Sequence, residues 1–392
     1  MCNKDTKFKR ALFLVNAASM IAHFNMSNIK LLLEQGYSVD VGCNFLHGNN
    51  CDDEKITQLK EELDKIGVRY YQIDFARTPF DLKLALGAYR QVADILKKND
   101  YSLLHCHTPM GGFIGRIAAA KYRKKGLKII YTAHGFHFYK GAPLINWLLY
   151  YPVEKICSYL TDILITINHE DFESAKRKMK AKKIEYIPGV GIDTKKFVSL
   201  PVEKRKELRE KFGIKEDDIL LISIGELNQN KNHSIIIKAL SELKRKDIYF
   251  FIVGVGYLEY ELKTSIRNCQ LESQVQLLGY SSNIPELYGM ADICCFPSIR
   301  EGLGLAALEG MSCGLALIAS KNRGTLDYSV DGDNALLCEP TAVKDFAEAI
   351  TKLADDPSLR RTMAIKNIEV AKHYDIETTN SIMKKIYIEI GS

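Results

Sequence analysis

The residues best placed to do chemistry lie in one short run, Pro297-Ser-Ile-Arg-Glu-Gly-Leu-Gly-Leu-Ala-Ala-Leu-Glu309. The run follows an apolar stretch that predicts a buried strand, and it opens a stretch with helical spacing. Gly302 and Gly304 let the backbone approach a ligand closely, and the N–H groups at a helix start suit a diphosphate. Glu301 at the loop tip and Glu309, about two turns into the helix, could hold sugar and ribose hydroxyls. The combination predicts a site for a phosphorylated sugar.

The elements that must position this run alternate between short apolar stretches and longer stretches with helical spacing. In the first half of the chain the predicted strands are 11–15, 38–43, 70–73, 103–107, 129–132, 163–167 and 184–187. Helices are predicted between them, for example over 25–35, 54–66, 79–98 and 115–124. Buried strands that alternate with helices indicate a parallel sheet covered on both faces.

The second half of the chain repeats this alternation. Its predicted strands are 219–224, 249–253, 275–278, 293–296, 316–319 and 335–337, and its predicted helices are 233–244, 258–268, 284–290, 303–312, 343–355 and 358–373. We therefore predict an α/β protein of two Rossmann-like, doubly wound parallel-sheet domains that face each other across a cleft. The predicted domains are 1–195 and 196–373, and the polar segment 198–211 is predicted to be a linker region.

The composition is that of a soluble globular protein, with 46% hydrophobic and 26% charged residues over a length of 392. No stretch approaches the ~18 apolar residues of a membrane span, and no cleavage site follows the short apolar run after Met1–Arg10. Ten cysteines lie at irregular positions, several of them within apolar stretches. We therefore predict free thiols in the reducing cytoplasm.

The net charge of +6 is unevenly placed along the chain. Basic residues cluster at 121–125 and 176–183, and the aromatic stretch 144–151 between them holds the only tryptophan, Trp147. Basic clusters near an amphipathic aromatic segment favour an anionic membrane surface, so we predict a peripheral protein on the inner face of the cell membrane. The alternative is that the lysines are solvated helix faces and Trp147 is a core residue. No nucleic-acid partner is predicted, because no recognised binding motif accompanies the basic residues.

The run around Gly302, together with landmarks elsewhere, resembles the retaining glycosyltransferase family 4, which has the GT-B fold. The matching donor-site pattern is Gly279-Tyr280, Tyr288, Ala291-Asp292, Pro297-Ser298, Glu301-Gly302, Glu309 and Gly314. The other landmarks, in the expected order, are His105-x-His107, Thr132-Ala-His134-Gly135, Pro188–Asp193 with Phe197, Gly225-x-Leu227 with Lys231, Val253-Gly-x-Gly256 and Asp331–Asn334. Three runs, 133–138, 225–233 and 322–325, are similar to the bacterial branch that builds capsular or exopolysaccharide units on a lipid carrier.

The resemblance implies a UDP-sugar donor held by the second domain. Lys231 would pair with the diphosphate, Glu309 with the ribose and Glu301 with the sugar ring. The remaining donor-site positions implied or expected are Gly225, Glu226, Asn230, Gly279, Tyr280, Arg300, Gly302, Leu303, Gly304, Leu305 and Arg323. Many relatives carry arginine where this chain has Glu226, so Lys231 would carry more of the charge, and the role of Glu226 stays open.

The resemblance also implies a catalytic role for His134, beside Lys231 and Glu301, and a last helix (374–392) that packs back on the first domain. Asn16, Ser19 and His107 are predicted to line a site for a polyprenyl-diphosphate-linked saccharide acceptor. No metal or cofactor is predicted, because a lysine and helix N–H groups would stabilise the leaving diphosphate. Attack on the face that the diphosphate leaves would then retain the anomeric configuration.

Four alternatives accompany this hypothesis. A UDP-sugar epimerase of the same fold, or a non-catalytic subunit that binds nucleotide sugars, would carry similar motifs. A zinc site is suggested by His105, His107, His134 and His137, but their spacing lacks a compact ligand set. A nicotinamide site is suggested by Val253-Gly-x-Gly256, but the third glycine of that fingerprint is missing.

Overall fold

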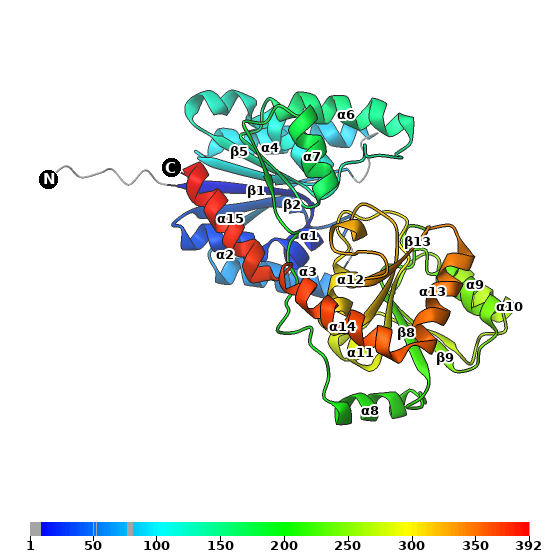
Figure 1. Ribbon diagram of the computed structural model, residues 1–392. Helices are drawn as coiled ribbons and strands as arrows, with labels where there is room; N and C mark the ends of the chain where they lie inside the picture. The colour runs from blue at the N-terminus through cyan, green and yellow to red at the C-terminus, as the bar shows by residue number, and fades with distance from the viewer. Residues whose placement is uncertain (1–8, 50, 52, 77–80, 392) are drawn as a thin grey trace. The chain divides into compact units, whose positions relative to one another are not determined.

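The protein folds as two α/β units, each built on one parallel sheet (Figure 1). The computed structural model describes residues 9–49, 51, 53–76 and 81–391. The first unit contains the chain up to Val190 and again from Thr379 onward, and the second contains the residues between. The predicted α/β class with two parallel sheets is confirmed.

The chain passes between the units slightly earlier than the predicted boundary after residue 195. Ile192 forms a β-bridge with Asp375, and the Thr194 hydroxyl donates to the Asp375 carboxylate at 2.5 Å. These contacts tie residues 191–195 to the second unit.

The first sheet has seven parallel strands in the order β3-β2-β1-β4-β5-β6-β7. They are β1 (Arg10–Ala17), β2 (Ser38–Asn44), β3 (Arg69–Gln72), β4 (Leu103–His107), β5 (Lys128–Ala133), β6 (Ile163–Thr166) and β7 (Lys183–Tyr186). The central strands are almost completely buried, as expected of a parallel sheet that is covered on both faces.

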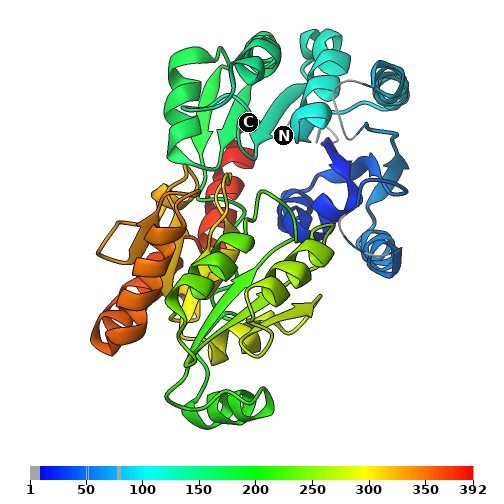
Figure 2. The same cartoon turned by 90° about the vertical axis from the view of Figure 1, so that its right-hand side faces the viewer.

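Helices cover both faces of this sheet (Figures 1 and 2). Because crossovers between parallel strands are right-handed, the helices after β1 and β2 lie on one face and those after β3 to β6 lie on the other. The first group is α1 (Ala18–Phe24), α2 (Met26–Glu34) and α3 (Asp53–Lys65), joined by α15 (Ile376–Gly391). The second group is α4 (Leu82–Lys98), α5 (Pro109–Ala119) with the 3₁₀ turn η1 (Ala120–Lys125), α6 (Leu144–Ser158) and α7 (His169–Lys178). The predicted helix start at residues 79–80 lies outside the described residues.

The second sheet has six parallel strands in the order β10-β9-β8-β11-β12-β13. They are β8 (Ile219–Ile224), β9 (Ile248–Val253), β10 (Val275–Gly279), β11 (Ile293–Phe296), β12 (Ala316–Ser320) and β13 (Ala335–Cys338). The helices are α8 (Val202–Lys211), α9 (Ser234–Leu243), α10 (Glu259–Asn268), α11 (Ile284–Met290), α12 (Leu305–Ser312), η2 (Thr325–Asp327), α13 (Val343–Asp355) and α14 (Pro357–Lys372). No helix within the described ranges is long and apolar enough to span a bilayer.

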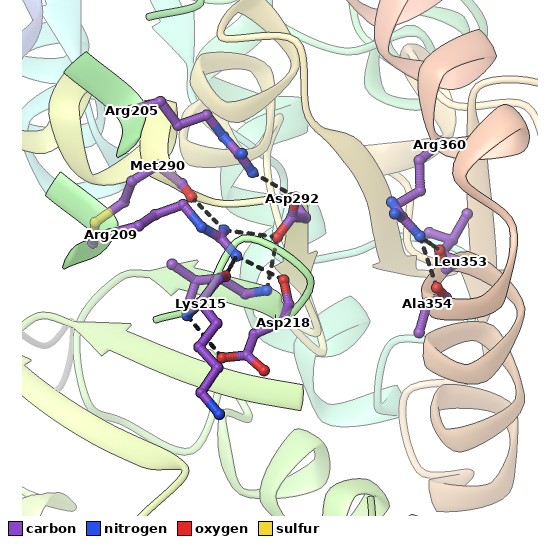
Figure 3. Close-up of polar contacts among 10 residues, drawn as sticks. Arg205, Arg209, Lys215, Asp218, Met290, Asp292, Leu353, Ala354 and Arg360 are labelled. Carbon is purple, nitrogen blue, oxygen red and sulfur yellow. Dashed lines mark hydrogen bonds and ion pairs between the residues drawn. The ribbon is translucent and has the colours of Figure 1, made fainter. Parts of the chain in front are cut away.

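The segment predicted as a linker region, 198–211, is wrong in part, because most of it forms the helix α8. The guanidinium of Arg209 is buried and donates to the carbonyl oxygens of Met290, Lys215 and Asp218 (Figure 3). It also donates to the carboxylate of Asp292 at 3.0 Å. The same carboxylate accepts a second bond from Arg205 at 2.6 Å. These contacts anchor α8 on the second unit, although its sequence is almost entirely polar. Arg360 plays a similar part at the end of α13, where it donates to the carbonyl oxygens of Leu353 and Ala354.

We expect Arg209→Met to lower the free energy of unfolding by roughly 3 kcal/mol, because three carbonyl groups and a carboxylate lose a buried donor. Arg205→Met is the matched control: it lies on the same helix and pairs with the same Asp292, but its side chain is 32% exposed against 3% for Arg209. Its cost should stay below about 1 kcal/mol. Urea unfolding followed by circular dichroism measures both, and equal losses would contradict the anchoring role of Arg209.

Candidate active site

Several residues of the predicted donor site gather where the strand order of the second sheet reverses, between β8 and β11. At such a point the two connections leave in opposite directions, which opens a crevice at the carboxyl ends of the strands. Hydrogen bonds of Asn230 join the loop after β8 to the loop after β11 there. Asn230 accepts at its carbonyl oxygen from the Ile299 N–H at 2.8 Å, and its side chain donates to the Arg300 carbonyl at 2.9 Å.

An ion pair links the same two loops. The ammonium of Lys231 lies 2.7 Å from the carboxylate of Glu301, and the two side chains are only 22% and 14% exposed. The Lys231 ammonium also lies 5.3 Å from the ring centroid of Phe296, at the end of β11. The cation and the carboxylate predicted for the diphosphate and the sugar ring are therefore close together and bind each other in the protein alone.

The glycine turn before α12 has the conformation that only glycine adopts without strain. Gly304 has a φ of +94°, and a Cβ at this position would lie 2.6 Å from the Phe296 ring. The helix therefore begins at Leu305 instead of the predicted Leu303, which is buried in the loop. The first N–H groups of any helix have no partner within it, so the start of α12 offers donors beside Gly302 and Gly304.

The segment after β12 donates hydrogen bonds to the backbone of this loop. Asn322 donates to the Ser298 carbonyl at 3.0 Å, and the buried Arg323 donates to the Glu301 carbonyl at 3.3 Å. A Cβ at Gly324 would lie 3.0 Å from atoms of Glu301 and Leu303, so glycine permits the close approach. Arg323 thus positions the loop backbone, whereas Arg300 is an exposed residue at its edge.

Glu309 lies on α12, and its carboxylate makes no hydrogen bond or ion pair with the described residues. Burial raises the pKa of Glu309 to about 7, and the charge of Lys196 lowers it only in part. A partly buried carboxylate without a partner lowers the stability of the fold. Such a group is typical of a ligand-binding site.

The loop after β8 is held by close backbone contacts with the loop after β9. A Cβ at Gly254 would lie 2.0 Å from the Gly225 carbonyl oxygen, and one at Gly256 would lie 2.4 Å from the Leu227 carbonyl oxygen. The glycines that suggested a nicotinamide fingerprint therefore serve loop packing. Glu226 is exposed between these contacts.

Gly279 and Tyr280, two of the predicted donor-site positions, lie at the carboxyl end of β10, two strands away from β8. Gly279 has a φ of +69°, and its carbonyl accepts from the Gly254 N–H at 2.8 Å. Nothing lies within 4 Å of a Cβ built on Gly279, and Tyr280 beside it is exposed. These two positions are therefore accessible within the second unit.

In the first unit, the strand order reverses between β1 and β4, and Asn16 lies at this point. Its side-chain oxygen accepts from the Thr108 hydroxyl and from the Gly111 N–H, both at 2.7 Å. Thr108 has a φ of +66°, an uncommon conformation for a β-branched residue that indicates local strain at a candidate site. Ser19 is buried, and its N–H donates to the Asn49 side chain at 3.0 Å. Asn16 and Ser19 therefore shape the turns at the edge where an acceptor is predicted.

Three histidines form two hydrogen-bonded groups near this edge: two lie in β4 and the third directly follows β5. His107 Nδ1 lies 3.0 Å from His134 Nε2, while His105 binds the Tyr387 hydroxyl at 2.8 Å and the Thr132 hydroxyl at 2.9 Å. Burial lowers the pKa of His134 to about 4 and that of His105 to about 3, and it also lowers that of His107. All three imidazoles are therefore neutral near pH 7.

These contacts also bear on the suggested zinc site. Both ring nitrogens of His105 are bonded to hydroxyl groups, and His137 stacks on Tyr150 with ring centroids 4.5 Å apart. Across the described part of the chain, no group of three or more His, Cys, Asp or Glu side chains could hold a metal ion.

Sequence reasoning missed two features of the first unit. One is the contact of His105 with Tyr387, which is 282 positions away in the sequence. The other is a cavity of about 520 Å³ whose lining includes Asn44, His47, Asp74 and Asp81. Polar residues at or soon after the ends of two buried strands, Asn44 after β2 and Asp74 after β3, were the signal that could have indicated it.

We expect Glu309→Gln to stabilise the protein at pH 8, because the wild-type carboxyl must ionise there in a poor environment. Its folded pKa, about 7, lies above the unfolded value, so wild-type stability falls as the pH rises from about 4.5 to 7. The variant should be more stable by roughly 2 kcal/mol at pH 8, and the gap should close near pH 5. Urea unfolding at both pH values measures this, with the exposed Glu348→Gln as control; a gap that does not depend on pH would contradict it.

Comparison with known proteins gives the same picture for both halves of the chain. Residues 204–370 match the family model "Glycosyl transferases group 1", and residues 10–168 match "Glycosyl transferase 4-like". A Bacillus subtilis (strain 168) protein named "Putative glycosyltransferase EpsD" is 36% identical over 382 residues, which is 97% of this chain and 96% of that protein. The UDP-Gal:alpha-D-GlcNAc-diphosphoundecaprenol alpha-1,3-galactosyltransferase of Escherichia coli is 28% identical, over 79% of this chain and 80% of that enzyme.

The fold also matches solved structures. The crystal structure of Anabaena Alr3699/HepE in complex with UDP and glucose superposes with a TM-score of 0.76 at 18% identity, over 97% of this chain and 100% of that one. The predicted GT-B fold is therefore confirmed. With both halves matched to glycosyltransferase models, and with a relative more than a third identical along nearly the whole length, this chain belongs to the group 1 glycosyltransferases and is a transferase enzyme.

Proposed function

We propose that this glycosyltransferase moves a sugar from a UDP-sugar to a polyprenyl-diphosphate-linked saccharide, with retention of the anomeric configuration and without a metal ion. The observation that carries the proposal is the group at the carboxyl edge of the second sheet. There Lys231, Glu301 and the glycine turn before α12 lie together, and α12 also carries Glu309 with its unpartnered carboxylate.

This group suits a nucleoside diphosphate sugar. A diphosphate brings negative charge to the Lys231 ammonium and to the N–H groups at the start of α12. When Lys231 binds the diphosphate, Glu301 is released from its ion pair and can accept bonds from sugar hydroxyls. Glu309 offers a carboxylate to the two ribose hydroxyls. The E. coli relative, whose name gives UDP-Gal as its donor, supports uridine as the base.

The same arrangement lowers the barrier to bond breaking. As the bond between the anomeric carbon and the diphosphate oxygen breaks, its electron pair moves onto the diphosphate, where Lys231 and the helix N–H groups stabilise the new charge. The acceptor hydroxyl then attacks from the face that the diphosphate leaves, and its proton passes to a diphosphate oxygen. Retention follows without a protein nucleophile or a metal ion.

His134 acts in this proposal as a neutral hydrogen-bonding group near the reacting sugar. Its Nε2 is taken by His107, whereas Nδ1 has no partner among the described residues. The low pKa of about 4 keeps the imidazole from competing with Lys231 for the diphosphate. His107 acts through His134 and is a positioning residue.

The acceptor is the part of the proposal that rests most on relatives. The E. coli enzyme named above acts, by its name, on a sugar linked to diphosphoundecaprenol. An acceptor with such a lipid anchor would hold the protein at the inner face of the cell membrane. The edge of the first sheet near Asn16 and Thr108 would bind the saccharide part.

The test is a panel of UDP-, GDP- and ADP-sugars incubated with the purified protein and a bacterial lipid extract, with products identified by mass spectrometry. We expect a lipid-linked product from a UDP-sugar, and release of free UDP only when acceptor is present. Activity confined to GDP- or ADP-sugars would overturn the base assignment. An epimerised UDP-sugar formed without acceptor would identify an epimerase, and no turnover of any sugar would favour a binding subunit.

We expect Lys231→Met to lower kcat by roughly 10²–10³-fold, because the charge that stabilises the leaving diphosphate is lost. The matched control is Lys263→Met on α10, an exposed lysine in a surface ion pair with Glu259. It should retain wild-type kcat. A Lys231→Met enzyme with kcat within threefold of wild type would show that the diphosphate is bound elsewhere.

A further inference from the structure

Helix α6 of the first unit is turned with its aliphatic side to the solvent. Six large aliphatic residues form one exposed stripe along it: Leu144, Ile145, Leu148, Leu149, Val153 and Ile156. Leu144 is 81% exposed, Leu148 72% and Ile156 63%. The spacing of the stripe is that of one helical face. Lys155 is the charged residue of α6 on that side, and its ammonium bonds the Tyr151 hydroxyl at 3.1 Å.

The opposite face of α6 carries its one acidic residue. Glu154 is buried and pairs with Arg116 of α5 at 2.8 Å, and its second oxygen accepts from the Tyr131 hydroxyl at 3.0 Å. Trp147 also faces the protein, where it packs against Phe138, and its ring lies 4.2 Å from the Lys178 ammonium. The buried ion pair thus fixes the rotation of α6, and Trp147 belongs to the margin of the core instead of the exposed stripe.

Neighbouring helices on the same face of the sheet extend the apolar surface. Helix α5, tied to α6 by the pair of Arg116 and Glu154, exposes Phe113 and Ile117 one turn apart. Helix α4, next to α5, exposes Leu82 and Leu86. All three helices cover the face of the first sheet opposite α15 (Figure 1).

The sequence around α6 is basic, since residues 101–160 contain eight lysines and arginines and a single acid, the buried Glu154. Two acids from outside this range reach it: Asp162 pairs with Arg123 at 3.1 Å, and Glu170 accepts from the Lys140 N–H at 3.0 Å. The 3₁₀ turn η1 reaches the end of α6, where Arg123 donates to the Tyr159 carbonyl at 3.1 Å, and Lys124 and Lys125 beside it are exposed. Lys140 is exposed before the helix begins.

We propose that this apolar stripe of α6, with its basic margin, is a docking surface for a membrane rich in anionic phospholipid. The stripe enters the boundary between headgroups and acyl chains, and the lysines bind lipid phosphates. A protein partner would need a matching acidic rim around an apolar groove, whereas an anionic bilayer supplies both features over any area. The proposal rests on the proposed function, in which the acceptor carries a lipid anchor.

The location of the stripe fits that use. Helices α4, α5 and α6 each follow a strand and run back along the sheet, so each begins toward the carboxyl edge of the first sheet. Leu82, Phe113 and Leu144 lie in the first two turns of these helices. The docking surface therefore borders the edge where Asn16 and Thr108 lie, and a saccharide on a lipid anchor would reach that edge without leaving the bilayer.

The test is flotation of the full-length protein with vesicles of phosphatidylglycerol and phosphatidylcholine (1:1) and with vesicles of phosphatidylcholine alone. We expect binding to the anionic vesicles only. Leu148→Glu and Ile156→Glu should each weaken binding by at least roughly tenfold, because a charge is placed in the apolar boundary. Ile365→Glu is the matched control, since Ile365 is 62% exposed on α14 of the second unit; it should bind as the wild type does.

Each other outcome decides against the proposal. Wild-type protein that does not float, or that floats equally well with phosphatidylcholine alone, overturns it, as do Leu148→Glu and Ile156→Glu variants that float like the wild type. A dimer in lipid-free buffer that Leu148→Glu converts to a monomer would show that a second copy covers the stripe. Turnover of a detergent-dissolved lipid-linked acceptor separates the two proposals: turnover without flotation leaves the proposed function standing and removes the docking surface.

Discussion

The ion pair of Lys231 and Glu301 holds together the two loops that leave the second sheet where its strand order reverses. Both side chains are mostly shielded from water, so each charge needs the other when no ligand is bound. In the proposed function, a diphosphate replaces the carboxylate as the partner of Lys231, and sugar hydroxyls then bond Glu301. The pair therefore keeps a shielded ammonium in place in the unliganded protein, and the rest of the candidate site depends on it.

Burial sets the protonation of the other groups, and it acts in opposite directions on acids and bases. Glu309 has no cation at hydrogen-bonding distance, so burial raises its pKa to about 7. The three histidines of the first unit have no carboxylate beside them, so burial lowers their pKa values and keeps them neutral. In the proposed reaction, the histidines therefore add no positive charge, and Lys231 and the start of α12 stabilise the leaving group.

Structural features that depend on residues close together in the sequence were predicted well. The alternation of strands and helices gave both parallel sheets, and the glycine run was placed correctly between β11 and α12. The start of α12 was wrong by two residues, because spacing alone cannot show that Gly304 takes a positive φ. The linker prediction failed at α8, because the helix is held by the buried guanidinium of Arg209, and its partners lie in other segments of the chain. The roles assigned to the site residues stay predictions, although Lys231, Glu301 and the glycine turn do lie together.

The orientation of α6 could not be predicted from its own sequence for the same reason. A helix with apolar residues on most sides gives no indication of which side faces the core. Here the direction is decided by Glu154, whose carboxylate meets Arg116, 38 positions earlier, and the hydroxyl of Tyr131. Breaking that buried pair would destabilise the fold by several kcal/mol. Burying two or three of the exposed leucines would stabilise it by about the same amount. The buried ion pair of Glu154 and Arg116 thus holds α6 in the rotation that leaves its aliphatic stripe exposed to solvent. Because such a stripe is unfavourable in water, its exposure supports the proposed docking of α6 on a bilayer.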